Sequence, residues 1–259
     1  MTPSLGAGML ACMCRLATLP WLLGALLLFS SCGSGTETGN PSLSGALSYT
    51  GYSSRPQEIG VREAASIATV ETAWFELEQV TVSQEGTCGV GGNGAFYVPA
   101  LGVGDHAAGR HNSTAFVGTA ATFCNVELPF GRVAEQAAGV PSELRGHALL
   151  LEGSLPDGTP FSIVSDATPA LVLGAESGGF ELEPGSADVL IAFDFASWLA
   201  DVDFASAERS GDAIVISAAE NSELLAAFEA RLASGVVLYR DRDADGVLDA
   251  EPEVLARAP

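Results

Sequence analysis

The stretch HALLLEGSLPDGTPFSIV, residues 147–164, gives the clearest indication of how this chain folds. Apolar side chains fill its two arms, and the turn sequence Pro156-Asp157-Gly158-Thr159 lies between them. Proline holds φ near the value that a turn requires, and glycine adopts the positive φ of a chain reversal. The stretch therefore predicts a β-hairpin with strands over 147–154 and 160–164.

Further strands are predicted on both sides of this hairpin. Residues 67–77 are rich in β-branched and aromatic side chains, and the apolar phase shifts between Leu77 and Val80, which indicates a break or bulge. Other strand-like runs are separated by turn residues at the spacing of a sandwich, and they are 114–117, 122–128, 179–183, 187–193 and 213–217. We expect a mainly β fold, one antiparallel β-sandwich, because the strands on either side of residue 144 are too few to close two cores.

One or two short amphipathic helices interrupt the strands. Behind Asp194 as N-cap, apolar residues recur at helical spacing, namely Phe195, Trp198, Leu199 and Val202. Residues 217–220 match a capping box, and an apolar stripe then runs to Gly235, formed by Leu224, Leu225, Phe228 and Leu232. We expect this stripe to pack into the core rather than to bind a partner.

Composition limits the function classes. The 259 residues contain 47% hydrophobic residues, enough for a sizeable core, so disorder throughout is excluded. They also contain 32 acidic residues against 11 basic ones, all arginine, which gives a formal net charge of −21. Because such a field repels phosphate backbones, nucleic-acid binding is excluded, and charged partners should be cations.

The N-terminal residues predict export. Arg15 precedes the apolar run 21–29, which is too short to be a stable membrane span. Leu28-Phe29-Ser30-Ser31-Cys32-Gly33 follows, and it resembles a lipobox, the signal of bacterial lipoproteins, with Phe29 a less usual residue at its position. The resemblance implies a signal peptide over 1–31 and a Cys32 that carries acyl chains such as palmitate. The alternative is an ordinary cleaved signal with Cys32 near its end.

Residues 32–42 are predicted to form a flexible tether, because they are small and polar and lack apolar periodicity. Gly33 stands where an aspartate would resemble an inner-membrane retention signal, so the outer membrane is the expected location. The anchor indicates a cell-envelope protein attached to the membrane through Cys32. An envelope or extracellular protein or a glycan is the expected partner.

The cysteines predict one disulfide. Cys12 and Cys14 leave with the signal and Cys32 takes the lipid, so Cys88 and Cys124 remain as an even pair in an oxidising compartment. Joining them would stabilise the fold by about 3–4 kcal/mol on the loop-entropy model. The alternative is two free buried thiols.

Residues 148–204, in which the strand-like run 189–195 follows the Asp-Gly hairpin, resemble bacterial lipoproteins of a domain-of-unknown-function type. The resemblance implies a transthyretin-like β-sandwich for the globular region 43–238. Because such families have no assigned activity, it implies a fold and no function.

Residues 239–253, YRDRDADGVLDAEPE, hold the main candidate site. Ca²⁺ takes six to eight oxygens, and Asp241, Asp243 and Asp245 occupy the first, third and fifth positions of a loop that turns at Gly246. The pattern resembles EF-hand-like calcium loops, including the dockerin and thrombospondin-repeat kinds. In such a loop Val247 would offer its carbonyl oxygen, and Asp249 would offer a direct or water-mediated oxygen.

The loop departs from that pattern at its twelfth position, where Pro252 replaces a bidentate acid. Glu251 or Glu253 would have to swing in, and Glu253 is included in the predicted site. The expected Ca²⁺ affinity is therefore modest, roughly 10⁻⁴–10⁻³ M as in extracellular modules. The alternative is an acidic turn that binds no ion.

Two glycine-containing motifs do not predict enzyme activity. Residues 89–94 match G-x-G-x-x-G, but a strand-like run follows where a dinucleotide site needs a helix. Residues 175–179 are similar to a nucleophile elbow around Ser177, and a strand follows there too.

A competing function class is an envelope hydrolase or metalloenzyme that uses Asp105, His106 and His111 as zinc ligands. The three residues lack helical spacing and are surrounded by glycines, so we expect a solvated polar loop there. The sequence thus predicts a non-catalytic binding or structural protein.

Overall fold

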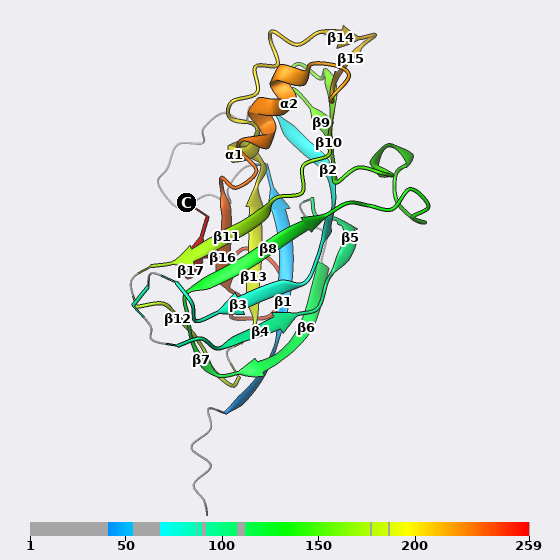
Figure 1. Ribbon diagram of the computed structural model, residues 1–259. Helices are drawn as coiled ribbons and strands as arrows, with labels where there is room; N and C mark the ends of the chain where they lie inside the picture. Colours follow the sequence, from blue (N-terminus) through cyan, green and yellow to red (C-terminus); the bar gives the residue numbers. More distant parts are fainter. Residues whose placement is uncertain are drawn as a thin grey trace, which may run out of the picture. The chain divides into compact units, whose positions relative to one another are not determined.

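Strands joined into one large curved sheet form the body of the molecule (Figure 1). The computed structural model describes residues 41–53, 68–86, 88–89, 92–107, 112–176, 178–185 and 187–258, which belong to one unit, Gly39–Pro259. The predicted signal peptide, Cys32 and most of the predicted tether lie outside these residues. Within the described ranges, no helix has the length and apolarity to cross a membrane.

The strands follow the chain in this order: β1 (Ser42–Tyr52), β2 (Thr69–Leu77), β3 (Val80–Ser83), β4 (Ala95–Val98), β5 (Gly102–Asp105), β6 (Asn112–Thr119), β7 (Ala121–Phe123), β8 (Asn125–Gly131), β9 (Leu149–Ser154), β10 (Pro160–Ser165), β11 (Ala170–Ala175), β12 (Phe180–Leu182), β13 (Val189–Asp194), β14 (Arg209–Ser210), β15 (Ala213–Ile216), β16 (Val236–Arg240) and β17 (Val254–Arg257). The helices are the 3₁₀ turn η1 (Ser142–Leu144), α1 (Phe195–Leu199) and α2 (Ser222–Glu229). The prediction of a mainly β protein with short helices is confirmed.

The large sheet runs β14-β15-β10-β9-β2-β8-β11-β17-β16-β13-β1-β6, with β5 on β2 and with β3 and β4 branching from β8. Strands from before and after η1 alternate in this order, so the described strands do not divide into two sandwiches. Most pairings are antiparallel, but β1 with β13 and β10 with β15 are parallel, which makes the sheet mixed. The small β7–β12 ribbon is a separate two-stranded sheet.

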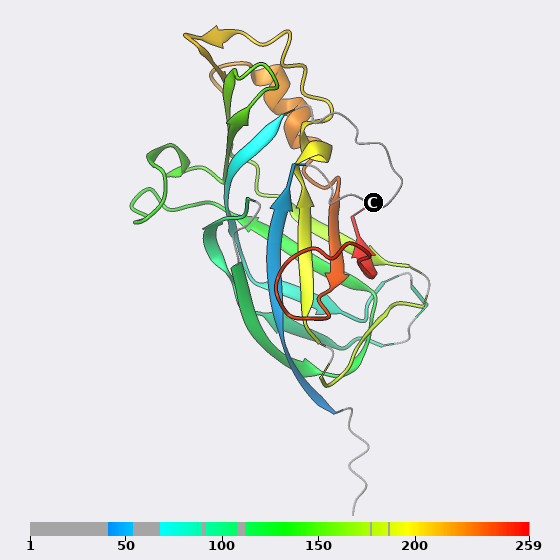
Figure 2. The ribbon, with the colours of Figure 1, turned by 180° about the vertical axis from the view of Figure 1, so that it is seen from behind.

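The sheet curves so that its parts face one another in a sandwich-like arrangement (Figures 1 and 2). Apolar side chains from both sides meet across a narrow gap, among them Leu47 on β1, Val126 on β8 and Leu238 on β16. An aromatic group lies at the centre of the core, where Phe75 stacks on Phe130 with ring centroids 5.0 Å apart. This core explains the apolar alternation of the strands.

The β9–β10 hairpin matches its prediction. Pro160 pairs with Ser154, and the register continues to Ser165 opposite Leu149. The Asp157 carboxylate accepts a hydrogen bond from the Thr159 amide at 2.9 Å, and Gly158 has φ +84°, a conformation that favours glycine. The break predicted after Leu77 is confirmed as well, because β2 ends there and β3 begins at Val80.

The predicted start of α1 is confirmed, whereas the predicted start of α2 is wrong. The Asp194 side chain caps α1 by accepting hydrogen bonds from the Ala196 and Ser197 amides, as expected. The capping box at 217–220 is wrong as a helix start, because Ser217 closes a local turn in which its amide donates to the Glu220 carbonyl at 2.7 Å. The chain then passes Asn221 in the left-handed region, so α2 begins at Ser222. The apolar stripe does enter the core, where Leu225, Phe228 and Leu232 are buried.

Candidate metal centre

The candidate loop 241–253 connects β16 to β17. The pairing of these two strands closes it, and the Arg240 amide donates to the Glu253 carbonyl at 3.0 Å. Figure 2 shows the loop, in orange-red, lying across the outer face of β1, β13 and β16. There Leu248 packs against a buried cluster on this outer face, which comprises Tyr52, Leu190, Ala192, Val237 and Tyr239. The loop therefore covers apolar surface.

Three predicted ligands come together. Oxygens of Asp241, Asp243 and Asp245 all lie within 4.8 Å of one another, the one such acidic group among the described residues. The backbone bends twice between them, with positive φ of 56° at Ala244 and 69° at Gly246. A positive φ at a non-glycine residue is disfavoured by roughly 1–2 kcal/mol. The sharp turn predicted at Gly246 is thus present.

Asp241 is the unusual member of the group. The residue is only 5% exposed. Its Oδ2 accepts a hydrogen bond from the Gly246 amide at 3.0 Å, whereas its Oδ1 is buried and has no hydrogen-bond partner among the described residues. Burial raises the pKa of Asp241; the Gly246 amide acts against this rise, the carboxylates of Asp245 and Asp243 add to it, and the net shift is upward. A buried carboxylate oxygen in this position is stabilised either by a proton or by a cation.

The other predicted ligands lie elsewhere in the loop. Oε2 of Glu253 pairs with Nε of Arg240 at 3.2 Å and with Nη2 of Arg242 at 2.9 Å. Burial would raise the pKa of Glu253, but the hydrogen bonds and charges of the two arginines outweigh burial and lower it. Neither Glu253 nor Asp249 belongs to the carboxylate group, and the Val247 amide donates to Asp245 Oδ1 at 2.8 Å. The structure therefore brings together the first half of the predicted ligand set.

Asp188 supports the loop, and sequence reasoning missed it. Its carbonyl oxygen accepts a hydrogen bond from the Asp241 amide at 3.1 Å. Its Oδ1 accepts from the Ala46 amide in β1 at 2.7 Å. No local signal marks this residue, because both contacts depend on the pairing of β13 with β1 and β16.

The Asp105–His106 segment corrects the prediction of a solvated polar loop. Asp105 is 9% exposed and His106 is fully buried. The His106 ring stacks on Phe75 with centroids 4.1 Å apart, and burial lowers its pKa to about 4. The reason is the pairing of β5 with β2, which carries the segment into the core. His111, the third predicted zinc ligand, lies outside the described residues.

The predicted disulfide between Cys88 and Cys124 is present, with Cα atoms 5.5 Å apart. The glycine motif beside it leads into strand β4, so it lacks the helix that a dinucleotide site requires. A strand, β12, also follows the motif around Ser177.

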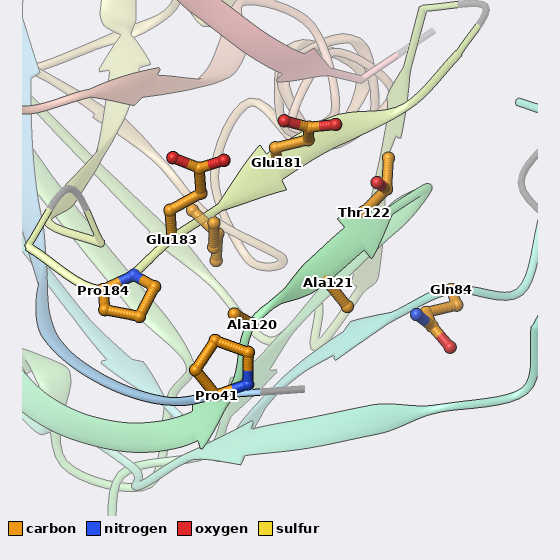
Figure 3. A pocket seen from close by; sticks show the side chains of 9 residues that line it. Pro41, Gln84, Ala120, Ala121, Thr122, Glu181, Glu183 and Pro184 are labelled. Carbon is orange, nitrogen blue, oxygen red and sulfur yellow. The ribbon is translucent and has the colours of Figure 1, made fainter. Parts of the chain in front are cut away.

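An open groove between the β7–β12 ribbon and the end of β3 was not foreseen (Figure 3). Its lining includes Gln84, Thr122, Glu181 and Glu183. The alternation Glu181-Leu182-Glu183 was the available sequence signal for an outward-facing acidic edge, and the structure does expose both glutamates. The groove itself joins segments that are distant in sequence.

Comparison with known proteins finds no match to a family model, to a curated protein or to a solved structure. The fold and loop define a β-rich protein with a carboxylate cluster at the end of a central strand. The transthyretin-like topology and the lipoprotein resemblance stay predictions, and function is argued from the site.

Proposed function

We propose that this chain is a lipid-anchored protein of the cell envelope with a binding or structural role, and that its loop 241–253 binds Ca²⁺. The resemblance of the sequence around Cys32 to a lipobox supports the anchor. One observation carries the calcium site: buried Asp241 has an unpartnered oxygen beside two further carboxylates. An envelope or extracellular protein or a glycan is the proposed partner.

The chemistry of the cluster favours calcium over other metals. The three side chains offer oxygen and no nitrogen or sulfur, which are the ligands that zinc prefers. Mg²⁺ demands near-ideal octahedral geometry and gives up its waters reluctantly, whereas Ca²⁺ tolerates the irregular ligand set of a flexible loop. With Glu253 held by arginines, water would complete the shell, so the proposed affinity is modest.

A cation here would act on structure. Asp241 directly follows β16, and Leu248 of the same loop packs on the outer-face cluster. Neutralising the three carboxylates would hold the loop over this apolar surface. Because such an ion binds the folded state and not the unfolded chain, it raises the free energy of unfolding by mass action.

The zinc-enzyme alternative gains no support from the described residues. Asp105 Oδ1 accepts hydrogen bonds from two backbone amides, those of Ala73 and Ala107. His106 is enclosed by aromatic rings. These contacts are typical of structural residues.

The test is the melting temperature of the chain from Ser34 onward, which keeps the whole described unit, measured with chelator and with millimolar Ca²⁺. At ten times the dissociation constant, calcium stabilises by about 1.4 kcal/mol, which shifts the midpoint by roughly 3–6 °C. Asp243→Asn with Asp245→Asn should abolish the shift. Asp201→Asn with Asp212→Asn removes the same charge from another surface and should keep it. An unresponsive wild type, or equal shifts in both variants, would remove calcium from the proposal.

A further inference from the structure

Five neighbouring strands of the large sheet, β6, β4, β3, β8 and β11, share an outer face that no helix of the described residues covers. Figure 1 shows these strands in front of β1 and β13, while α1 and α2 lie at the other end of the sheet. β3 pairs with β4 and with β8, and β8 pairs with β11. β4 also lies beside β6, where Phe96 stacks on Phe116 on the inner side with ring centroids 5.1 Å apart. The five strands therefore present one continuous surface.

A transverse row of side chains crosses this face. The strand register places Thr81 opposite both Tyr97 and Glu127, and it places Glu127 opposite Val172. These residues alternate with buried ones along their strands, so their side chains point away from the core. Val117 on β6 continues the row beyond Tyr97, because the residues that precede these two stack on the inner side. Tyr97 is 58% exposed, Val117 73% and Val172 49%.

The face is almost without charge. Glu127 is the one charged residue in these five strands, although the chain carries a formal net charge of −21. The adjoining strands β2 and β9 differ, since they carry Glu71, Glu76 and Glu152. A second copy of this chain, a nucleic acid or an anionic lipid would bring negative charge to the face and be repelled by the molecule as a whole. An uncharged polymer would meet no such repulsion.

The side chains of the row match the chemistry of a sugar chain. A sugar ring has apolar C–H groups on its faces and hydroxyl groups around its edge, so it requires flat apolar contact and hydrogen bonds in the same place. The exposed ring of Tyr97 supplies the apolar contact, and the negative face of an aromatic ring attracts polarised C–H groups. The Thr81 hydroxyl donates and accepts hydrogen bonds, and the Glu127 carboxylate accepts them.

The spacing of the row favours an extended sugar chain. Neighbouring strands lie about 4.8 Å apart, which is close to the length of one sugar unit in an extended chain. A chain laid across the strands therefore presents successive sugars to successive members of the row. Because the sheet backbone holds these positions before binding, little ordering is required when the ligand binds.

We infer that this outer face binds an uncharged, extended polysaccharide, with sugar rings on Tyr97 and sugar hydroxyl groups on Thr81 and Glu127. Val117 and Val172 extend the apolar contact at the two ends of the row. The inference rests on the proposed binding role and selects a glycan as the partner. The calcium loop lies elsewhere, across the outer face of β1, β13 and β16 (Figure 2).

Three hexasaccharides test the inference: cellohexaose is uncharged and extended, maltohexaose is uncharged and coiled, and hexagalacturonate is anionic. Titration calorimetry at low salt measures their binding to the full chain, with chelator in every solution so that calcium has no influence. Cellohexaose should bind most tightly. Maltohexaose should bind more weakly because a coiled chain contacts fewer members of the row, and hexagalacturonate should show no binding.

Variants locate the site. Tyr97→Ala should lower cellohexaose affinity about tenfold, whereas Tyr97→Phe keeps the ring and should bind like the wild type. Glu127→Ala removes a hydrogen-bond acceptor and should lower the affinity about fivefold. The matched control Glu71→Ala removes an exposed glutamate from β2, outside the row, and should leave the affinity unchanged. Melting temperatures establish that each variant is folded.

Four results would overturn the assignment: no cellohexaose binding, equal affinity for either of the other sugars, full affinity in Tyr97→Ala, or equal losses in Glu127→Ala and Glu71→Ala. A dimer in sedimentation that Tyr97→Ala dissociates would assign the face to a second copy instead. The calcium melting experiment separates these failures from that of the proposed function. A chain that responds to calcium but does not bind cellohexaose keeps its calcium site and loses only this assignment.

Discussion

Asp105 and Asp241 are both buried aspartates at the end of a strand, but their surroundings differ. Oδ1 of Asp105 accepts hydrogen bonds from the Ala73 and Ala107 amides, each at 3.0 Å. Oδ1 of Asp241 has no partner among the described residues, and two more carboxylates lie beside it. Two backbone amides satisfy Oδ1 of Asp105, whereas Asp241 has the Gly246 amide on Oδ2 and its Oδ1 is left for a proton or a cation. A buried carboxylate thus indicates a cation-binding site only when one of its oxygens has no hydrogen-bond donor.

The largest effect is expected at Asp105. Asp105→Ala leaves two buried backbone amides without an acceptor, at a cost of about 1–3 kcal/mol each, so the free energy of unfolding should fall by roughly 3–4 kcal/mol. Urea denaturation measures this loss. The calcium-induced shift should persist, because the carboxylate cluster of the loop is untouched. A loss below about 1 kcal/mol would show that Asp105 is not structural.

The next effect is a pH dependence at His106. Burial lowers its pKa to about 4, against 6.5 for an exposed histidine. Between these values the unfolded chain binds more protons than the folded one, so stability rises with pH from about 4 to 6.5 and falls on acidification. The full difference is about 3 kcal/mol. Denaturant titrations across this range should show a flatter profile for His106→Gln; identical profiles would assign the acid sensitivity to other groups.

The smallest effect is expected at Asp241 in chelator. Because its pKa is raised, the folded state binds more protons than the unfolded chain above the usual aspartate pKa, so this residue makes stability fall as pH rises. Asp241→Asn should remove that slope and slightly stabilise the metal-free protein, because it ends the repulsion from the Asp245 and Asp243 carboxylates; the gain should stay below about 1 kcal/mol, the size of exposed charge–charge interactions, while the calcium response is abolished. Melting curves between pH 4 and 7 with chelator and with Ca²⁺ measure both effects. If the variant were less stable than the wild type and still responded to calcium, Asp241 would be a structural residue like Asp105 and not a calcium ligand.

Much of the fold could be predicted because its signals are local. The β9–β10 turn depends on Asp157 and Gly158 within a few residues, and the Asp194 cap acts on the amides two and three positions ahead. Asp241, Asp243 and Asp245 come together through backbone bends inside one short loop. The disulfide between Cys88 and Cys124 was predicted from the number of cysteines that remain once Cys12, Cys14 and Cys32 are assigned to the signal and the lipid.

Other features depended on contacts between distant segments. His106 is buried because β5 pairs with β2, and Glu253 meets Arg240 because β16 pairs with β17. The start of α2 also depends on contacts outside the helix. The Asn221 side chain, at the N-cap, donates hydrogen bonds to the Glu208 and Val215 carbonyls, and a search for a capping motif does not reveal these contacts.

The sequence by itself determined the β-rich class, the hairpin, the disulfide and the place of the carboxylate loop. Each rests on the conformational preference of a few neighbouring residues or on simple counting. The tertiary structure alone decided that Asp105 accepts a hydrogen bond from the Ala73 amide of a distant strand, which acids are paired with arginine and which line a groove. Strand pairings decide these outcomes, because they bring together residues that no short window of sequence contains.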